Sequence, residues 1–198
     1  MKTLLISAAV AASILPTAAA AQAIPGAVIA VVDLEKVTSQ CNACKTAGAA
    51  LRSQAAALQS RQQALVAPLQ TEQKAIQAAI DALPQGKEPD AALKQRATAF
   101  QTKYQQAQEE VANSERQIQR NQAYINQQVR DKLGPIYQQV MQRRGANLLV
   151  EVGNTLATAS SLDVSNDVLA ALNAAMPTLQ TSAPAQAATP KPAQPQGR

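Results

Sequence analysis

Two cysteines, Cys41 and Cys44, are the side chains of this sequence with the clearest chemical potential. A Cys-x-x-Cys pair can form a local disulfide, cross-link two chains, stay unpaired or act as a redox centre. Redox exchange of the thioredoxin type needs an alternating strand–helix domain around the pair, and the pattern here contains none. A zinc site would need two further ligands, and the chain has no His and no third Cys. We favour a structural disulfide and leave the unpaired and intermolecular forms open.

The other polar residues form no catalytic constellation. The absence of His excludes imidazole triads and His-ligated zinc, iron or copper. Asp33 and Glu35 are close in sequence but have no evident base partner, and the charges around Glu110 and Arg116 are typical of a solvated helix face. There is no Gly-rich phosphate loop. We expect no enzymatic activity, no cofactor and no metal.

The composition favours an elongated helical protein. Of 198 residues, 46% are hydrophobic but only 2% are aromatic, and Ala is the most frequent of the apolar residues. An Ala side chain buries less apolar area than a larger aliphatic or aromatic side chain. A chain with this composition is therefore not expected to form a large compact core. Ala and Gln both tolerate helix, and a chain rich in them but poor in bulky residues is typically extended.

The first residues resemble an export signal. Lys2 is followed by an apolar stretch that is too short to span a bilayer, and Ala18 to Ala21 supply small residues for cleavage. We predict a cleavable signal peptide over residues 1–21, with the cut after Ala21. No later segment reaches the roughly 18 apolar residues of a membrane helix. With no lipid-attachment Cys at the cut, this indicates a bacterial periplasmic protein.

Three short apolar segments should form a small β body built from residues 22–50 and 132–176. Strands are expected at 28–34, 148–152 and 156–159, with a tight turn at Gly153-Asn154 and a closing helix at 167–176. A sheet this small cannot stand alone, and it has apolar residues on both faces. Copies of the same chain should therefore cover it in a ring. The expected oligomer core is Ile29, Val31, Leu34, Leu149, Val150, Val152 and Leu156.

Between these strands the pattern is helical. One helix is expected from Glu35 to Leu83 and a second, capped by Asp90, to Arg144, with Gly145 as its stop. The turn cluster at 84–89 should fold them into an antiparallel coiled-coil hairpin, the arm, over residues 51–131.

The seam of this hairpin is weak. Apolar residues recur at spacings of three and four, as in a coiled coil, but Gln62, Gln73, Ser114 and Asn121 occupy positions where Leu would pack better. Pro68 and Gly134-Pro135 should bend the helices. An ordinary coiled-coil spacer would also explain the stripe, but not the flanking strands.

The arm is mildly basic. Residues 51–131 hold ten basic and eight acidic side chains. Such a surface suits weak attraction to acidic polypeptides or to anionic lipid or lipopolysaccharide surfaces, although solubility explains it equally well. An exported chain without stacking aromatics is not expected to bind nucleic acid. The candidate contacts are Lys94, Arg96, Lys103, Arg116 and Arg120. Residues 177–198 are rich in Pro, Ala and Gln and should be disordered.

The layout resembles the Skp/OmpH-like family of periplasmic chaperones for outer-membrane proteins. The matching features are the signal, the opening strand IAVVDLEKV, the Ala/Gln-rich hairpin, ANLLVEVGNTLATASS and the closing LDVSNDVLAALN. The resemblance covers about residues 28–175. It implies a homotrimer with a small β-barrel body and three tentacles that enclose unfolded outer-membrane proteins without ATP. The Cys pair, Pro68 and the tail after Met176 depart from the family pattern.

Two other functions remain open from the sequence. An envelope adaptor could use the hairpin as a spacer that docks one folded partner, and its Pro-rich tail could be recognised by other domains. A Cys-based redox enzyme would require insulin-reducing activity that disappears in Cys41→Ser. A chaperone differs from both because it binds many unfolded β-barrel proteins.

Overall fold

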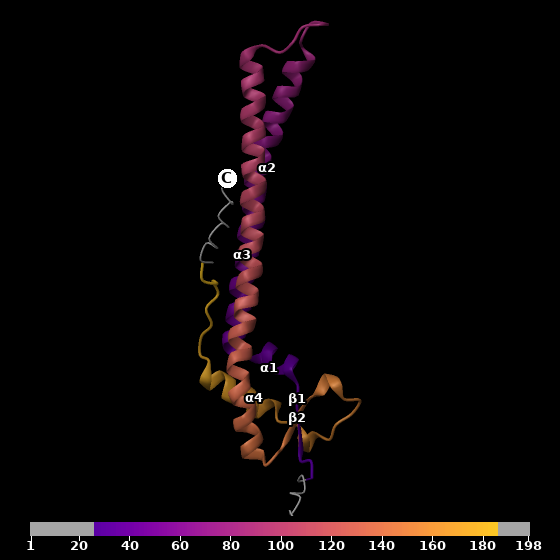
Figure 1. Ribbon diagram of the computed structural model, residues 1–198, viewed down its shortest axis with the longest axis vertical. Coiled ribbons are helices and arrows are strands. Elements are labelled where there is room, and N and C mark those ends of the chain that lie inside the picture. Colours follow the sequence, from indigo (N-terminus) through magenta and orange to yellow (C-terminus); the bar gives the residue numbers. More distant parts are fainter. Residues whose placement is uncertain (1–25, 186–198) are drawn as a thin grey trace, which may run out of the picture.

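The molecule has a small body at one end, and a long helical hairpin extends from this body (Figure 1). This computed structural model describes residues 26–185, so the expected signal peptide at 1–21 lies outside it. The elements are β1 (Ile29–Val32), α1 (Leu34–Gln40), α2 (Asn42–Asp81), α3 (Ala91–Arg144), β2 (Leu148–Glu151), the short 3₁₀ turns η1 (Val152–Asn154) and η2 (Ser160–Leu162), and α4 (Ser165–Ala175). The predicted mainly helical fold with a small β body and a helical hairpin is confirmed.

Local capping chemistry sets the ends of the second arm helix. The Asp90 carboxylate accepts a hydrogen bond from the Leu93 N–H at 2.8 Å and so satisfies a free donor at the start of α3. At the other end Gly145 has a φ of 64°, a left-handed conformation that glycine adopts without strain. The predicted start at Asp90 and stop at Gly145 are both confirmed.

The seam between α2 and α3 is well packed only near the body. Ile125, Val129, Leu133, Ile136 and Val140 are all buried at this end. Further from the body most seam residues are half-buried. In this outer part of α2 the buried seam residue is Ile76. The apolar spacing also predicts Ala55, Ile80 and Tyr104 in the seam, and this is wrong: they are exposed, as is Gln73. Ala is too small and Gln too polar to gain much from a seam position.

The first helix is not continuous as predicted. Cys41 has an extended ψ of 126° and separates α1 from α2, so that the chain turns there before entering the arm. The Cys41 sulfur caps the new helix by accepting a hydrogen bond from the Cys44 N–H at 3.2 Å. Both α2 and α3 run unbroken through Pro68 and Pro135.

Two strands, not three, form the sheet. β1 and β2 pair in parallel with Ile29 opposite Leu148, and the whole hairpin is the crossover between them. The predicted strand at 156–159 is wrong, and no hairpin forms there: an exposed loop and η2 follow η1. The predicted tight turn at Gly153-Asn154 is present, because the Thr155 N–H donates to the Val152 carbonyl at 3.0 Å. On the other side of β1 the Val164 N–H donates to the Val31 carbonyl at 2.8 Å.

The body core lies where α1, α3 and α4 meet the sheet. Val37, Val140, Val168 and Leu172 are fully buried there. The closing helix begins at Ser165, two residues earlier than predicted. Ser165 also links the segment that precedes the hairpin to the segment that follows it. Its hydroxyl accepts from the Asp33 N–H at 2.8 Å and donates to the Asp163 carboxylate.

The segment after α4 packs against the rest of the chain. Residues 177–185 run back along the hairpin (Figure 1), and Leu179 packs against the core. The Gln180 N–H donates to the Gln128 side chain at 3.0 Å. The expectation of disorder is therefore wrong for 177–185, because this stretch gains an apolar contact and main-chain hydrogen bonds. Residues 186–198 of the expected disordered tail lie outside the described part.

Candidate functional site

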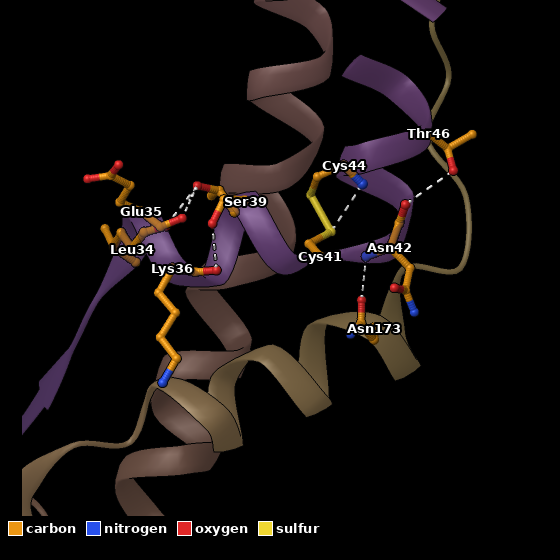
Figure 2. Close-up of a disulfide and its surroundings, with 10 residues drawn as sticks. Leu34, Glu35, Lys36, Ser39, Cys41, Asn42, Cys44, Thr46 and Asn173 are labelled. Atoms are coloured by element: carbon orange, nitrogen blue, oxygen red, sulfur yellow. Dashed lines mark hydrogen bonds between the residues drawn. A yellow bond between two sulfur atoms is a disulfide. The ribbon is translucent and has the colours of Figure 1, made fainter. Parts of the chain in front are cut away.

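The cysteine pair forms a disulfide at the junction of α1 and α2 (Figure 2). Cys41 is fully buried and Cys44 is partly buried. The neighbouring Asn42 N–H donates to the Asn173 side chain at 2.9 Å, so the same corner is also tied to α4. Thiol–disulfide exchange requires access to a sulfur atom, and burial of Cys41 opposes it. The arrangement suits a cross-link that holds the turn between the body and the arm.

The five candidate basic residues all lie on α3 but are not gathered into one site. From position 94 to 120 the helix rises about 40 Å at 1.5 Å per residue. Lys94 pairs with Glu88 at 2.9 Å, and Arg96 makes two hydrogen bonds to Glu72 on α2. These cations are partly neutralised within the chain.

The three basic residues nearer the body differ in their partners. Arg116 donates to the Asn113 side chain and Arg120 to that of Gln117, one turn earlier on the same helix. Lys103 forms no ion pair with any residue in the 26–185 range. It lies near Glu72, whose pKa is lowered mainly by the Arg96 hydrogen bond. Within the described part of the chain, Lys103, Arg116 and Arg120 thus form no ion pair with a carboxylate.

Apolar side chains are exposed on the sheet and on the loop that follows it, and we refer to them together as the apolar patch. Of the expected oligomer-core residues, Val31 is buried within the chain, and Leu34, Leu149 and Val150 are half-buried. The others are open to solvent, and Leu156 is 108% exposed. Sequence reasoning missed three further members. The exposed apolar residues of the patch are Val28, Ile29, Leu148, Val152, Leu156 and Leu162. Clusters of exposed apolar residues usually mark interaction surfaces.

A groove continues from this body onto the root of the arm. Its volume is about 670 Å³, and apolar side chains of α1, α2 and α3 dominate its lining, among them Leu34, Leu51 and Val129. Leu34 and Tyr137 also line a second hollow beside the sheet. The pKa of Tyr137 is raised, first by burial and then by the charge of Glu151. Sequence reasoning missed Tyr137, which lies just outside the seam.

Further out, large apolar residues are exposed singly on the arm. Val66 and Ile80 on α2 are 47% and 40% exposed, and Tyr104 on α3 is 43% exposed. The Tyr104 ring stacks on Phe100 with a centroid separation of 6.1 Å. These residues offer scattered weak contacts and no deep pocket of the kind that tight binding uses.

Residues 26–185 contain no group of three or more side chains suited to hold a metal ion. None of the helices formed by these residues has the length and apolar character needed to cross a bilayer.

Comparison with known proteins identifies the family. The family described as outer membrane protein (OmpH-like) matches residues 28–172. This stretch runs from the start of the sheet into α4, and the chain belongs to the OmpH-like family. The resemblance inferred from the sequence is thereby confirmed.

One solved structure has the same fold. It comes from Caulobacter crescentus and is described as a candidate outer-membrane chaperone (OmpH-like). The two chains are 21% identical, the match covers 81% of this chain and 90% of the other, and the TM-score is 0.67. At this identity the likeness establishes the fold. The search of curated proteins found no match.

Proposed function

We propose that this protein is an ATP-independent periplasmic holdase chaperone. It acts as a homotrimer whose arms enclose unfolded outer-membrane β-barrel proteins and keep them from aggregating. The observation that carries the proposal is the pairing of a long free arm with a body whose edge is apolar and exposed, Leu156 above all. Membership of the OmpH-like family supports the same function.

The exposed edge of the body supports self-assembly. An apolar patch of this kind is rarely left open on a monomer, and copies of the same chain can cover it symmetrically. Such packing would close the sheets of several protomers into a barrel and point the arms to one side. The oligomer core then includes Ile29, Val152 and Leu156, with the half-buried Leu34, Leu149 and Val150 beneath them.

The arm surface supports loose capture of clients. Val66, Ile80 and Tyr104 give scattered apolar contacts, and unpaired cations such as Lys103 and Arg116 attract acidic segments. Many weak contacts hold a client without forcing it into one conformation. The same cations, with Arg120, Lys94 and Arg96, are our candidates for contacts with anionic lipid or lipopolysaccharide. Nothing in this mechanism needs a nucleotide, a cofactor or a catalytic residue.

Aggregation of a denatured β-barrel protein, diluted from urea, tests the function. We expect light scattering to be suppressed at one trimer per client, with or without ATP, and capture to slow as salt rises. Several unrelated β-barrel clients should all be protected. Failure to protect any of them at this ratio would reject the proposal.

The adaptor alternative gains no support from these observations. It relies on a tail that is free for another domain to bind, whereas residues 177–185 contact the hairpin of their own chain. If the protein binds one folded partner and does not protect unfolded clients, the adaptor function is supported over the holdase function.

A further inference from the structure

The stretch that follows α4 is held to the arm through its main chain. Both main-chain groups of Gln180, its N–H and its carbonyl, are hydrogen-bonded. Its N–H donates to Gln128 Oε1 at 3.0 Å, and its carbonyl accepts from Gln128 Nε2 at 2.9 Å. One side-chain amide thus satisfies both main-chain groups of one residue, as a neighbouring strand would do.

Two further amides continue this pattern along the groove between the arm helices. Gln54 Nε2 donates to the Thr181 carbonyl at 3.2 Å, and Asn121 Oδ1 accepts from the Ala183 N–H at 2.8 Å. Asn121 Nδ2 in turn donates to Gln54 Oε1 at 2.8 Å, which locks the two side chains together across the seam. Amide groups from both helices therefore present donors and acceptors to one extended chain.

This network explains a polar residue in the seam. Asn121 is only 3% exposed and occupies a position where Leu would pack better. A buried amide is costly unless its groups are hydrogen-bonded. Within the described residues its partners are Gln54, Gln117 and the Ala183 N–H, so the bound segment supplies one of them.

The recognition depends little on which side chains the bound segment carries. Among the described residues, no side chain from 178 to 183 takes part in a hydrogen bond to the arm; every such bond uses an N–H or a carbonyl of the segment. Leu179 provides an apolar contact, because it packs against the cluster of Ala47, Leu51 and Ile125. Beyond Ser182 the groove continues as a hollow of about 460 Å³ lined in part by Leu58 and Ile118.

We propose that Gln54, Asn121 and Gln128 form a binding site for extended polypeptide main chain, occupied in cis by residues 179–183. The ligand is an extended segment with an apolar residue in the place of Leu179 and free N–H groups one and four residues later. Unfolded β-barrel segments have this chemistry and compete for the site in trans, a step that rests on the proposed holdase function. Tethering gives the cis segment a high effective concentration, so a client must bring several segments to displace it.

Proline substitutions test the site in the full chain. Gln180→Pro with Ala183→Pro removes the two N–H donors and leaves the arm unchanged, whereas Ser182→Pro removes an N–H that bonds to no described residue and is the matched control. The probe is a synthetic peptide of residues 177–185, added at millimolar concentration. The readout is the NMR signals of the Gln54, Asn121 and Gln128 side-chain amides.

In the double variant we expect the tail to detach and the peptide to bind at least ten-fold more tightly than it binds the native chain or Ser182→Pro. Adding Gln128→Ala should remove this binding, and a peptide with the same two prolines should not bind. If the tail of the double variant stays docked, or if the peptide binds it no better than it binds the control, the proposal is wrong.

A denatured β-barrel client tests the trans step separately. Its binding to the native chain should shift the three side-chain amide signals and release the Gln180 and Ala183 N–H groups from protection. If the trimer holds the client while these signals stay unchanged, competition at this site is disproved and the holdase function stands.

Discussion

Arg96 and Glu72 join the two helices of the arm through paired hydrogen bonds, Nε to Oε1 at 2.6 Å and Nη2 to Oε2 at 2.9 Å. Arg61 and Glu110 repeat this pairing nearer the body. Each pair places its cation and carboxylate on opposite helices, so the two pairs act as cross-links where the apolar seam is thin. Both are exposed to solvent, which limits what each contributes to stability.

These pairs predict that acid loosens the arm. The arginine hydrogen bonds hold the pKa of Glu72 and of Glu110 below the usual value. The stabilisation is present above the carboxyl pKa of the unfolded chain and is lost as the pH falls through the folded-state pKa. Helix content followed by circular dichroism should fall in this acid range in the native protein.

The matched control is Glu72→Gln with Glu110→Gln, which should lose most of this pH dependence. Its helix content at neutral pH should be slightly lower than that of the native protein, and the acid step should shrink. An unchanged acid transition in the double variant would show that other carboxylates control the arm.

Ser165 should be the most sensitive polar residue of the body. Ser165→Ala removes the acceptor for the Asp33 N–H and leaves that group unsatisfied, whereas Asp163 loses one donor but keeps the Ser165 N–H. We expect unfolding to cost about 1–3 kcal/mol less in the variant. Urea denaturation at fixed protein concentration measures this, with the exposed Ser161→Ala as control. Equal stabilities of the two variants would contradict this role for Ser165.

Leu156 offers a clean test of assembly because it contacts little in its own chain. Leu156→Asp should leave the fold of the single chain unchanged but convert a trimer to smaller species, since the charge would have to be buried between copies. Light scattering coupled to size exclusion gives the mass. Thr158→Asp adds the same charge to an exposed polar residue of the same loop and should stay trimeric. A Leu156→Asp protein that remains trimeric would place the interface elsewhere.

The disulfide should contribute modestly to stability. Cys41 and Cys44 enclose a very short loop, for which the chain-entropy model gives about 2 kcal/mol. Cys41→Ser with Cys44→Ser should therefore unfold at lower urea but keep its assembly and its protection of clients. Mass spectrometry without reductant should find both thiols of the native protein blocked to alkylation. Insulin-reducing activity in the native protein that is absent from the variant would point instead to redox exchange.

The exposed apolar residues of the arm should carry part of client binding. Replacing Val66, Ile80 and Tyr104 together by Gln should weaken protection of a denatured β-barrel protein several-fold, because each loses an apolar contact of about 1 kcal/mol or less at a half-exposed site. Gln63→Ala, Gln70→Ala and Gln105→Ala change exposed polar residues of the same helices and serve as control. If both triple variants protect the client equally well, these apolar residues do not contribute and clients are bound through charge alone.

Local rules predicted the hairpin because its signals lie within a few residues of one another. Asp90 and Gly145 act on their own helix ends, and the apolar period fixes the face that packs. The break at Cys41 carries only a weak signal: Thr38, Ser39 and Asn42 are poor helix formers, but no Pro or Gly marks the position. The loop at 156–159 alternates apolar and small residues as a short strand does, and its own residues do not show that it stays outside the sheet.

The candidate site was less predictable because its contacts join residues far apart in sequence. The basic residues of α3 could be identified, but not which of them pair with Glu72 or Glu88. The docking of residues 179–183 uses main-chain atoms, which every sequence has. Its one trace in the sequence is a polar residue, Asn121, at a position where the heptad pattern calls for an apolar one.

The parallel pairing of β1 with β2 has a consequence for how the protein folds. Val28 and Asn147 are hydrogen-bonded although 119 residues separate them, so the first strand is synthesised long before its partner. The hairpin needs mostly nearby contacts and can form quickly, whereas the strands pair only after it has brought them together. Until then each new chain carries an open β edge, the same hazard it is proposed to relieve in others.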